Sequence, residues 1–600
     1  MTQVTVDQAL FTAWKLYQEH KLHEAEVIFR SILAQQPNEV RASYGLGLLA
    51  LEARHPSAID LISTALPVAG DHSEVLNNLG SAYQSQGRSR EAVEWYRKAL
   101  AISPNSSGIM SNLGHALVMV EEREEAEAVC RRAIELDPGN SSAYNNLGTA
   151  IKAGERHGEA EAAFRKALEI KPDFPEALSN LGNLVHDDGQ YEQAIALFRR
   201  ATLLAPTMPD AYNNMSNSLR LVGRLDEAVA TARQAISLRG QFPAAYSNLG
   251  AALHQLGRHE EAVIAFRQAI AFEPEMADAH VNLALSLMLQ GQFAEGLREY
   301  EWRRKTSKFM RLERRIKGPA WDGTPGRGTG TILVSAEQGV GDTIQFVRFV
   351  RQVQQRGWRV ALHSMTSLVR LMSQSAAELR LDAIIPWTDD NSETLPAFDV
   401  HCPLASLPVI LGQIDPNSPS MPQPPYLRVD PELQATWRDR LRAKVAPGMK
   451  TVGLVWAGRP SHLDDRNRSI PLARLAPLAS PGVQFVSLQI GPAARQAGIP
   501  LPGFKLLDLT PDITDFADTA ALVCELDLIV TVDTATAHLA GALNRPACVL
   551  LPWVPDFRWM LNRPDTPWYP SLRLYRQSAI GQWDQVITRL ATDMRQTLAQ

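Results

Sequence analysis

The first 300 residues carry a pattern of small, apolar and amide side chains that repeats every 34 residues. Its most regular part is the triplet Asn-Leu-Gly, or a close variant, which begins at residues 78, 112, 146, 180, 214, 248 and 282. Around each triplet, alanine and apolar positions recur with the spacing of two amphipathic helices. A proline often ends the unit, because proline has no N–H to donate and its ring disfavours continued helix. The pattern predicts a series of antiparallel helical pairs.

In the first clear unit the recurring positions are Tyr83, Ala92, Tyr96, Ala99 and Pro104. This set resembles the tetratricopeptide repeat. In such a unit Gly and Ala lie where the two helices approach closest, and the aromatic residue fills the space between neighbouring units. Two less regular units precede it, and a last unit starts near residue 277. The resemblance implies about nine helical pairs over residues 1–304, stacked into a superhelix with a long concave face.

One asparagine recurs on the first helix of each regular unit. These residues, here called the asparagine ladder, are Asn78, Asn112, Asn146, Asn180, Asn214, Asn248 and Asn282. First helices line the inner face of such arrays, and a primary amide offers both a donor and an acceptor. The ladder is similar to that in the repeat domain of eukaryotic nucleocytoplasmic O-GlcNAc transferase, which implies capture of the main chain of an extended acceptor polypeptide. The alternative is a solvated groove, since Asn is common at this position in repeats of many functions.

The 34-residue pattern ends near Arg304, and a different rhythm follows a basic, glycine-rich linker over residues 305–328. A basic stretch of this kind is usually a solvated surface; the alternative is binding of a phosphate or a partner. Short apolar runs then alternate with helical segments, which is typical of parallel sheets with helical connections. A proline cluster between residues 416 and 425 divides two such regions. We expect strands at 331–334, 359–362, 383–385, 400–402, 451–456, 484–488, 528–532 and 547–551.

Four segments of this half resemble the heptosyltransferase-like glycosyltransferases, glycosyltransferase family nine. They are AEQGVGDTIQF (336–346), VGLVWAGRPSHLDDRNRSIPL (452–472), LIVTVDTATAHLAGALNRPACVLLP (528–552) and WVPDFRWMLNRPDTPWYPSLRLYRQ (553–577). The resemblance is greatest to the bacterial branch that is fused to tetratricopeptide repeats, several members of which are assigned to protein glycosylation, including that of flagellin. It implies the GT-B architecture, with an acceptor-side lobe over residues 329–428 and a donor-side lobe with a C-terminal helix over 445–600. The expected fold is an all-α tetratricopeptide-repeat superhelix followed by an α/β GT-B module of two Rossmann-like lobes.

Asp342 stands at the junction of the first strand with its helix, after Gly339 and Gly341. The glycines permit a tight turn that brings the backbone close to a ligand. In the resembling family the matching Asp is the general base, which inverting sugar transfer needs because the acceptor hydroxyl loses a proton as it attacks. The alternative is a helix cap that satisfies free N–H groups, and the position allows either role or both.

A second candidate region opens the helix after the strand at 528–532. Its residues are Asp533, Thr534, Ala535, Thr536 and His538. Helix N-termini bind anions, so the phosphates of a nucleotide-sugar donor fit there, where the resemblance also places the donor. For His538 the alternative is a buried, hydrogen-bonded ring.

The loop at 457–469 brings Arg466 and Arg468, either of which can offset the charge that grows on a departing phosphate. The alternative is a solvated arginine, or one paired with Asp464 or Asp465. No Asp-x-Asp metal motif occurs, and the pairs 389–390 and 464–465 are adjacent residues in polar loops, so we expect chemistry that uses neither a metal nor a cofactor. The turn also lacks the third glycine of a dinucleotide fingerprint, which argues against an oxidoreductase.

The composition excludes several further classes of protein. The net charge of −5 gives no cationic field for nucleic acid, and four scattered cysteines form no disulfide framework. With no stretch of 18 apolar residues and no secretory signal, we expect a cytoplasmic protein that has no transmembrane segment.

Three hypotheses follow for the function. The first is a glycosyltransferase that moves a sugar to Ser or Thr of a protein acceptor held by the repeats, with flagellin as the leading candidate. The second is a transferase acting on a glycan or lipid-linked acceptor, with the repeats as a docking scaffold. The third is a non-catalytic interaction scaffold. The sequence identifies neither the sugar nor the acceptor protein.

Overall fold

The computed structural model describes residues 5–67, 72–152, 156–307, 309–310, 316–387, 395–461 and 465–599. The chain divides into two compact units, Met1–Gly240 and Gln241–Gln600. Among the described residues, no helix is both long enough and apolar enough to cross a membrane.

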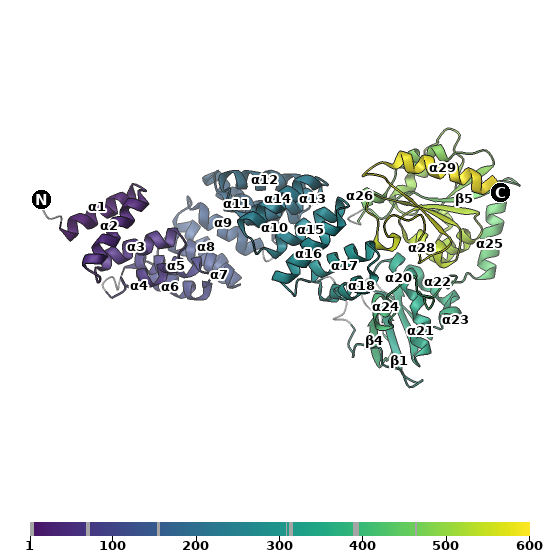
Figure 1. Ribbon diagram of the computed structural model, residues 1–600, viewed down its shortest axis with the longest axis horizontal. Helices are drawn as coiled ribbons and strands as arrows, with labels where there is room; N and C mark the ends of the chain where they lie inside the picture. Colours follow the sequence, from purple (N-terminus) through teal and green to yellow (C-terminus); the bar gives the residue numbers. More distant parts are fainter. Residues whose placement is uncertain are drawn as a thin grey trace. The chain divides into compact units, whose positions relative to one another are not determined.

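The first unit is a run of antiparallel helical pairs (Figure 1). Its helices are α1 (Val6–Gln18), α2 (Leu22–Gln35), α3 (Val40–Glu52), α4 (Ala58–Ser63), α5 (Ser73–Ser85), α6 (Ser89–Ile102), α7 (Ser107–Met119), α8 (Arg123–Leu136), α9 (Ser141–Lys152), α10 (His157–Ile170), α11 (Pro175–Asp187), α12 (Tyr191–Leu204), α13 (Pro209–Leu221) and α14 (Leu225–Leu238). Each odd-numbered helix packs against the even-numbered one that follows it. The helical pairs predicted from the 34-residue pattern are therefore confirmed.

The triplet glycine makes the close approach within each pair possible. A Cβ at Gly80 would lie 2.7 Å from the ring of Tyr96, and one at Gly148 would lie 2.7 Å from the ring of Phe164. Gly182 stands in the same relation to Phe198. The aromatic residue thus packs on the glycine of its own unit, whereas the sequence interpretation placed it between neighbouring units. Glycine is needed because any side chain would displace a buried ring.

The second unit begins with two more helical pairs. Their helices are α15 (Pro243–Gln255), α16 (His259–Phe272), α17 (Ala277–Leu289) and α18 (Phe293–Tyr300), followed by the 3₁₀ helix η1 (Glu301–Lys305). The all-α repeat array thus continues to about residue 304, and the α/β region follows it. Part of the expected linker, residues 308 and 311–315, lies outside the described residues. Its later part is packed, since Trp321 is buried and Ala320 forms a bridge with His401.

A four-stranded parallel sheet comes next, in the order β3-β2-β1-β4. Its strands are β1 (Thr331–Ser335), β2 (Arg359–Met365), β3 (Ala383–Trp387) and β4 (Val400–Pro403). Its helices are α20 (Val340–Phe346), η2 (Val347–Phe349), α21 (Val350–Gln355), η3 (Thr366–Leu368), α22 (Val369–Gln374), α23 (Ala376–Leu379), η4 (Leu404–Ser406) and α24 (Leu407–Ile410). All four strands were predicted, each with one or more residues added at its end.

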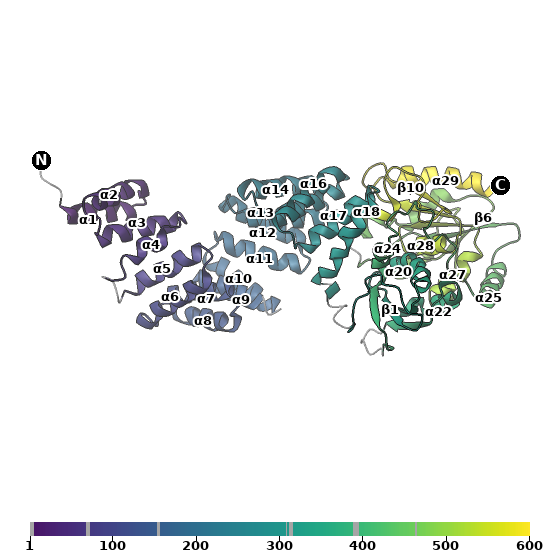
Figure 2. The same ribbon diagram turned by 60° about the horizontal axis from the view of Figure 1, so that its bottom comes forward.

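A six-stranded parallel sheet forms the rest, in the order β10-β9-β8-β5-β6-β7. Its strands are β5 (Lys450–Val455), β6 (Val483–Ser487), β7 (Leu506–Asp508), β8 (Leu528–Val532), β9 (Ala547–Leu551) and β10 (Leu572–Arg576). Its helices are α25 (Pro431–Arg442), α26 (Asp465–Arg468), η5 (Leu472–Leu478), η6 (Pro492–Gly498), η7 (Thr510–Asp512), α27 (Phe516–Cys524), α28 (Ala535–Ala542), η8 (Phe557–Trp559) and α29 (Trp583–Ala599). In both views α29 lies on one side of this sheet and α28 on the other (Figure 2). The sequence analysis did not predict β7 and β10.

The proline-rich segment joins the two sheets, and Tyr426, directly after it, is buried. Tyr426 donates from its main-chain N–H to Ala542 O at 3.1 Å, and its hydroxyl accepts a hydrogen bond of 2.9 Å from Arg348 Nη2. Arg348 also donates to Trp568 O at 3.0 Å. One buried cluster contains residues of both sheets together with Phe293 and Tyr300 of α18. The last repeats and the two sheets therefore share a hydrophobic core.

Candidate active site

Asp342 lies in the first turn of α20, directly after the glycine turn that follows β1. The main-chain N–H of Gly339 donates to Asp342 Oδ2 at 2.9 Å, so the carboxylate caps its own helix. The other oxygen, Oδ1, accepts a hydrogen bond from Arg558 Nη2. A quarter of the side chain is exposed, and a carboxylate oxygen can accept more than one hydrogen bond. Capping is therefore observed, and it leaves a proton-accepting role open.

Arg558 is a central site residue that the sequence analysis missed. It is buried, and it also donates from Nη1 to Asp556 Oδ1 at 2.9 Å and from Nε to Gln345 Oε1. Burial by itself lowers the pKa of Arg558, but the charges of Asp556 and Asp342 outweigh burial and raise the pKa above its ordinary value. The segment 553–577 had been singled out by resemblance alone. Nothing in its spacing indicated a partner 216 residues away.

The second candidate region begins at the carboxyl end of β8. Asp533 is buried, and burial together with the charge of Asp556 raises its pKa to about 6. Thr534 stands at the N-cap of α28 with an extended backbone, and its hydroxyl lies 3.0 Å from that of Thr531. Ala535 and Thr536 form the first turn, so their N–H groups belong to the helix end that attracts anions.

His538 is buried inside the same helix. Its Nδ1 lies 3.0 Å from the Tyr569 hydroxyl, and its ring stacks on Trp559 with centroids 5.2 Å apart. Burial, reinforced by the charges of Arg558 and Arg348, lowers the pKa of His538 well below its ordinary value, so the ring is neutral at pH 7. This geometry fits a hydrogen-bonded core histidine. A contact with the donor stays a prediction.

The two candidate regions meet where α20 packs against α28. A Cβ at Gly341 would lie 2.8 Å from His538 Cδ2, so only glycine allows this approach. Because both helices begin at the carboxyl ends of parallel strands, the contact brings those ends of the two sheets together, where open α/β sheets bind their ligands.

The structure separates the two arginines of the 457–469 loop. Arg468 Nη1 donates to the main-chain O of Asp533 at 2.9 Å, and its Nε lies 3.5 Å from Asp465 Oδ1. Arg466 is exposed on α26. Arg468 is thus next to the start of α28. His462 and Asp464 lie outside the described residues, as do Asp389 and Asp390.

The asparagine ladder has partners inside the array. The side-chain amide of Asn78 donates to Tyr44 Oη at 2.7 Å, and that of Asn112 donates to Asn77 Oδ1 at 2.9 Å. Asn146, Asn180 and Asn214 donate in the same way to Ser111 O, Asn145 Oδ1 and Asn183 Oδ1 at 2.9, 2.9 and 2.7 Å. Each of these amides reaches the preceding repeat. Asn248 and Asn282 are half-buried on α15 and α17 of the second unit.

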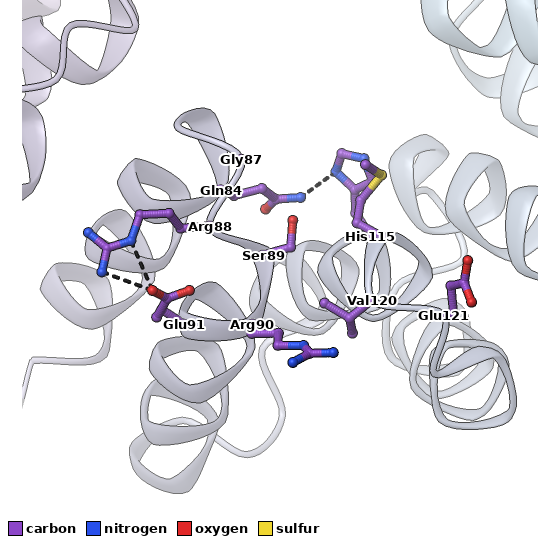
Figure 3. Close-up of a pocket in the computed structure, with 10 residues that line it drawn as sticks. Gln84, Gly87, Arg88, Ser89, Arg90, Glu91, His115, Val120 and Glu121 are labelled. Carbon is purple, nitrogen blue, oxygen red and sulfur yellow. Dashed lines mark hydrogen bonds and ion pairs between the residues drawn. The ribbon is translucent and has the colours of Figure 1, made fainter. Parts of the chain in front are cut away.

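Other places in the chain are less suited to the expected chemistry. Within the residues that the structure describes, no group of three or more His, Cys, Asp and Glu could hold a metal ion. A cavity of about 690 Å³ lies among the helix ends of α5, α6 and α7, where Gln84 Nε2 is 2.7 Å from His115 Nδ1 (Figure 3). It is an open hollow at turns of the array, and it holds none of the predicted site residues.

Comparison with known proteins identifies the repeats. Models of the tetratricopeptide repeat match residues 73–106, 112–175, 152–217, 207–272 and 277–302. Protein FlbA of Caulobacter vibrioides is 27% identical over 324 residues, which are 51% of this chain and 53% of that protein. The chain thus spans about half the length of the curated relative that it matches. The N-terminal half carries tetratricopeptide repeats, which are protein-interaction modules.

Solved structures with helical repeats are also similar. The APC/C hetero-tetramer Cut9-Hcn1 is 17% identical, with a TM-score of 0.40, over 47% of this chain and 56% of that one. YrrB, a TPR protein with an unusual peptide-binding site, is 25% identical, with a TM-score of 0.27, over 31% and 96%. Pseudomonas aeruginosa PilF is 20% identical, with a TM-score of 0.31, over 34% and 94%.

Proposed function

We propose that this protein is a glycosyltransferase that moves a sugar from a nucleotide-sugar donor to Ser or Thr hydroxyls of a protein acceptor bound by the repeats. The observation that carries the proposal is the meeting of α20 and α28. This contact joins Asp342, which follows β1 of the first sheet, with the anion-attracting start of α28, which follows β8 of the second sheet. The family resemblance favours flagellin as the acceptor.

In the proposed reaction Asp342 accepts the proton of the acceptor hydroxyl while that oxygen attacks the anomeric carbon. Its quarter-exposed carboxylate is accessible to an incoming hydroxyl. The bond to the nucleotide phosphate breaks, and the charge that develops there meets the N–H groups at the start of α28. Arg468, bonded to Asp533 O, adds a positive charge beside that helix end.

The test is incubation of the full chain with a panel of nucleotide sugars and candidate acceptor proteins, including flagellin, read by intact mass. We expect a sugar adduct on one acceptor with the wild type. Asp342→Asn keeps the helix cap but cannot take the proton, so turnover should fall by about 10²–10⁴-fold while donor binding is retained. Turnover within about tenfold of the wild type would place the base elsewhere.

A non-catalytic interaction scaffold is the second candidate, and one observation favours it. Both oxygens of Asp342 already accept hydrogen bonds, from Gly339 N–H and from Arg558. For the scaffold we expect no adduct with any donor and no thermal stabilisation by any nucleotide sugar. A ligand that binds only the folded state raises its unfolding temperature, so the transferase should show such a shift.

A further inference from the structure

The last two helical pairs do more than end the repeat array. Residues of α17 and α18, among them Met288, Phe293 and Tyr300, lie in the same buried cluster as Ile332 of β1 and Ile529 of β8. Phe293 also meets Trp568 edge to face at 5.8 Å. The array therefore contributes side chains to the core on which both sheets are built.

One polar link joins the end of the array to the loop before α20, the helix that carries Asp342. Arg303 of η1 is buried and donates to Glu337 Oε1 at 2.9 Å and to Ser406 Oγ at 2.7 Å. It also donates to Glu301 Oε1 at 2.6 Å. Glu337 is buried five residues before Asp342, and burial raises its pKa, while the charge of Arg303 opposes that rise. Truncating Arg303 would leave a buried carboxylate without its partner.

A second link joins the turns of the last two repeats to the segment 553–562, here called the arginine segment. At Gly257, where φ is +81°, a Cβ would lie 2.7 Å from Trp553 Nε1. That nitrogen donates to the neighbouring Leu256 O at 3.2 Å. At Gly291, where φ is +83°, a Cβ would lie 3.1 Å from Met560 Cε. Both ends of the arginine segment thus rest on turn glycines.

The same turns are open in earlier repeats. Gly87 and Gly189 have the same left-handed backbone, with φ of +76° and +79°, and a Cβ at either would meet no atom within 4 Å. The contacts at Gly257 and Gly291 are thus additions to a turn that the repeat forms without them. Between those contacts stands Arg558, and its neighbour Phe557 lies 6.3 Å from the ring of Tyr300.

We infer that Arg558 is a positioning residue for the Asp342 carboxylate, and that the turns at Gly257 and Gly291 hold the arginine segment so that it can do so. The last two repeats then complete the transferase site. This inference rests on the proposed function, because the position of Asp342 matters for turnover only if Asp342 acts in transfer.

The test compares Gly257→Ala with Gly189→Ala in the full chain. Both variants place a Cβ on a left-handed residue, so both carry the same backbone strain, but only Gly257→Ala pushes on Trp553. We expect amide hydrogen exchange to quicken about tenfold in both the arginine segment and α20 of Gly257→Ala. Its kcat should fall while the donor KM stays unchanged. Gly189→Ala should match the wild type in all of these measurements.

A faster exchange confined to the arginine segment, with α20 and kcat unchanged, would overturn the inference. Equal behaviour of the two glycine variants would overturn it as well. Because exchange needs no turnover, it still reports on the link if the wild type transfers no sugar. In that case the proposed function fails by itself.

The variants Arg558→Lys and Arg558→Ala test whether Arg558 positions the Asp342 carboxylate or only stabilises the fold. Lysine keeps the charge but has no planar fork, so it cannot serve Asp342, Asp556 and Gln345 together. We expect kcat to decrease from wild type to Lys to Ala, with the donor KM unchanged in all three. A loss of donor binding in step with the loss of kcat would instead assign Arg558 to the donor site.

Discussion

At the scale of single residues, the burial of Asp533 sets a pH dependence of stability. Its pKa is raised from 3.8 to about 6, chiefly by burial. Between those values the folded chain keeps the proton and the unfolded chain loses it, so the free energy of unfolding falls as pH rises from about 4 to 6. Asp533→Asn should remove that loss. Above pH 6 its free energy of unfolding should exceed that of the wild type by up to about 3 kcal/mol.

The measurement is thermal unfolding of wild type and Asp533→Asn across that pH range, followed by circular dichroism. The stabilities of the two proteins should be equal near about pH 4 and should differ increasingly towards about pH 7. A constant difference at every pH would mean that the substitution acts through packing or hydrogen bonds. No difference at any pH would mean that the carboxyl is hydrated in solution.

The sequence located only part of the residue-level arrangement. Asp342 and the 533–538 region could be picked out as candidates, because each follows a strand of a parallel sheet, and the carboxyl ends of such strands form sites. The partner of Asp342 could not be expected, since Arg558 lies on a 3₁₀ turn, where no periodicity marks an inward residue. The choice between Arg466 and Arg468 also needed the fold, because α26 is too short for its sequence to define a buried face.

At the scale of elements, the interior strands of the six-stranded sheet were predictable and its edge strands were not. β8 and β9 were predicted with their observed bounds, since strands covered on both faces of a parallel sheet are almost wholly apolar. The two missed strands, β7 and β10, are the edges of the six-stranded sheet. β7 has only three residues, and β10 carries Arg573 and Arg576, which is how edges discourage further pairing.

The asparagine ladder is a second feature at this scale. Because its amides form hydrogen bonds inside the array, removing them should lower the stability of the array. Asn146, Asn180 and Asn214 each donate to the preceding repeat. Replacing all three by Ala should lower the stability of the array by about 1.5–4.5 kcal/mol, at about 0.5–1.5 kcal/mol for each bond. Asn105→Ala, at an exposed turn, is the matched control and should have little effect.

Melting followed by circular dichroism measures this loss, and binding of the acceptor protein to the still-folded variant measures recognition. A ladder that captures the main chain of an acceptor should lose affinity as well as stability. Lost stability with unchanged affinity would make the ladder a set of links between repeats. If neither changes, the ladder is only a solvated face.

At the scale of the whole molecule, the position at which the repeats can be removed follows from the shared core. The chain divides into its two compact units between residues 240 and 241, so the last two helical pairs belong to the same unit as the sheets. Residues 241–600 should therefore fold and bind a nucleotide sugar, but should lose capture of a protein acceptor. Residues 305–600 should misfold, because they lack Phe293 and Tyr300 from the core and leave Glu337 buried without Arg303.

Circular dichroism and a thermal-shift panel of nucleotide sugars test whether each of the two fragments folds and binds a donor. We expect the longer fragment to show a cooperative transition that a donor raises, and the shorter one to aggregate or melt broadly. Breaking a buried ion pair by removing one partner costs about 3–5 kcal/mol, which is a large share of a typical domain's stability. If residues 305–600 melt as sharply as 241–600 and bind the same donor, the last repeats are dispensable, and the array contributes only acceptor recognition.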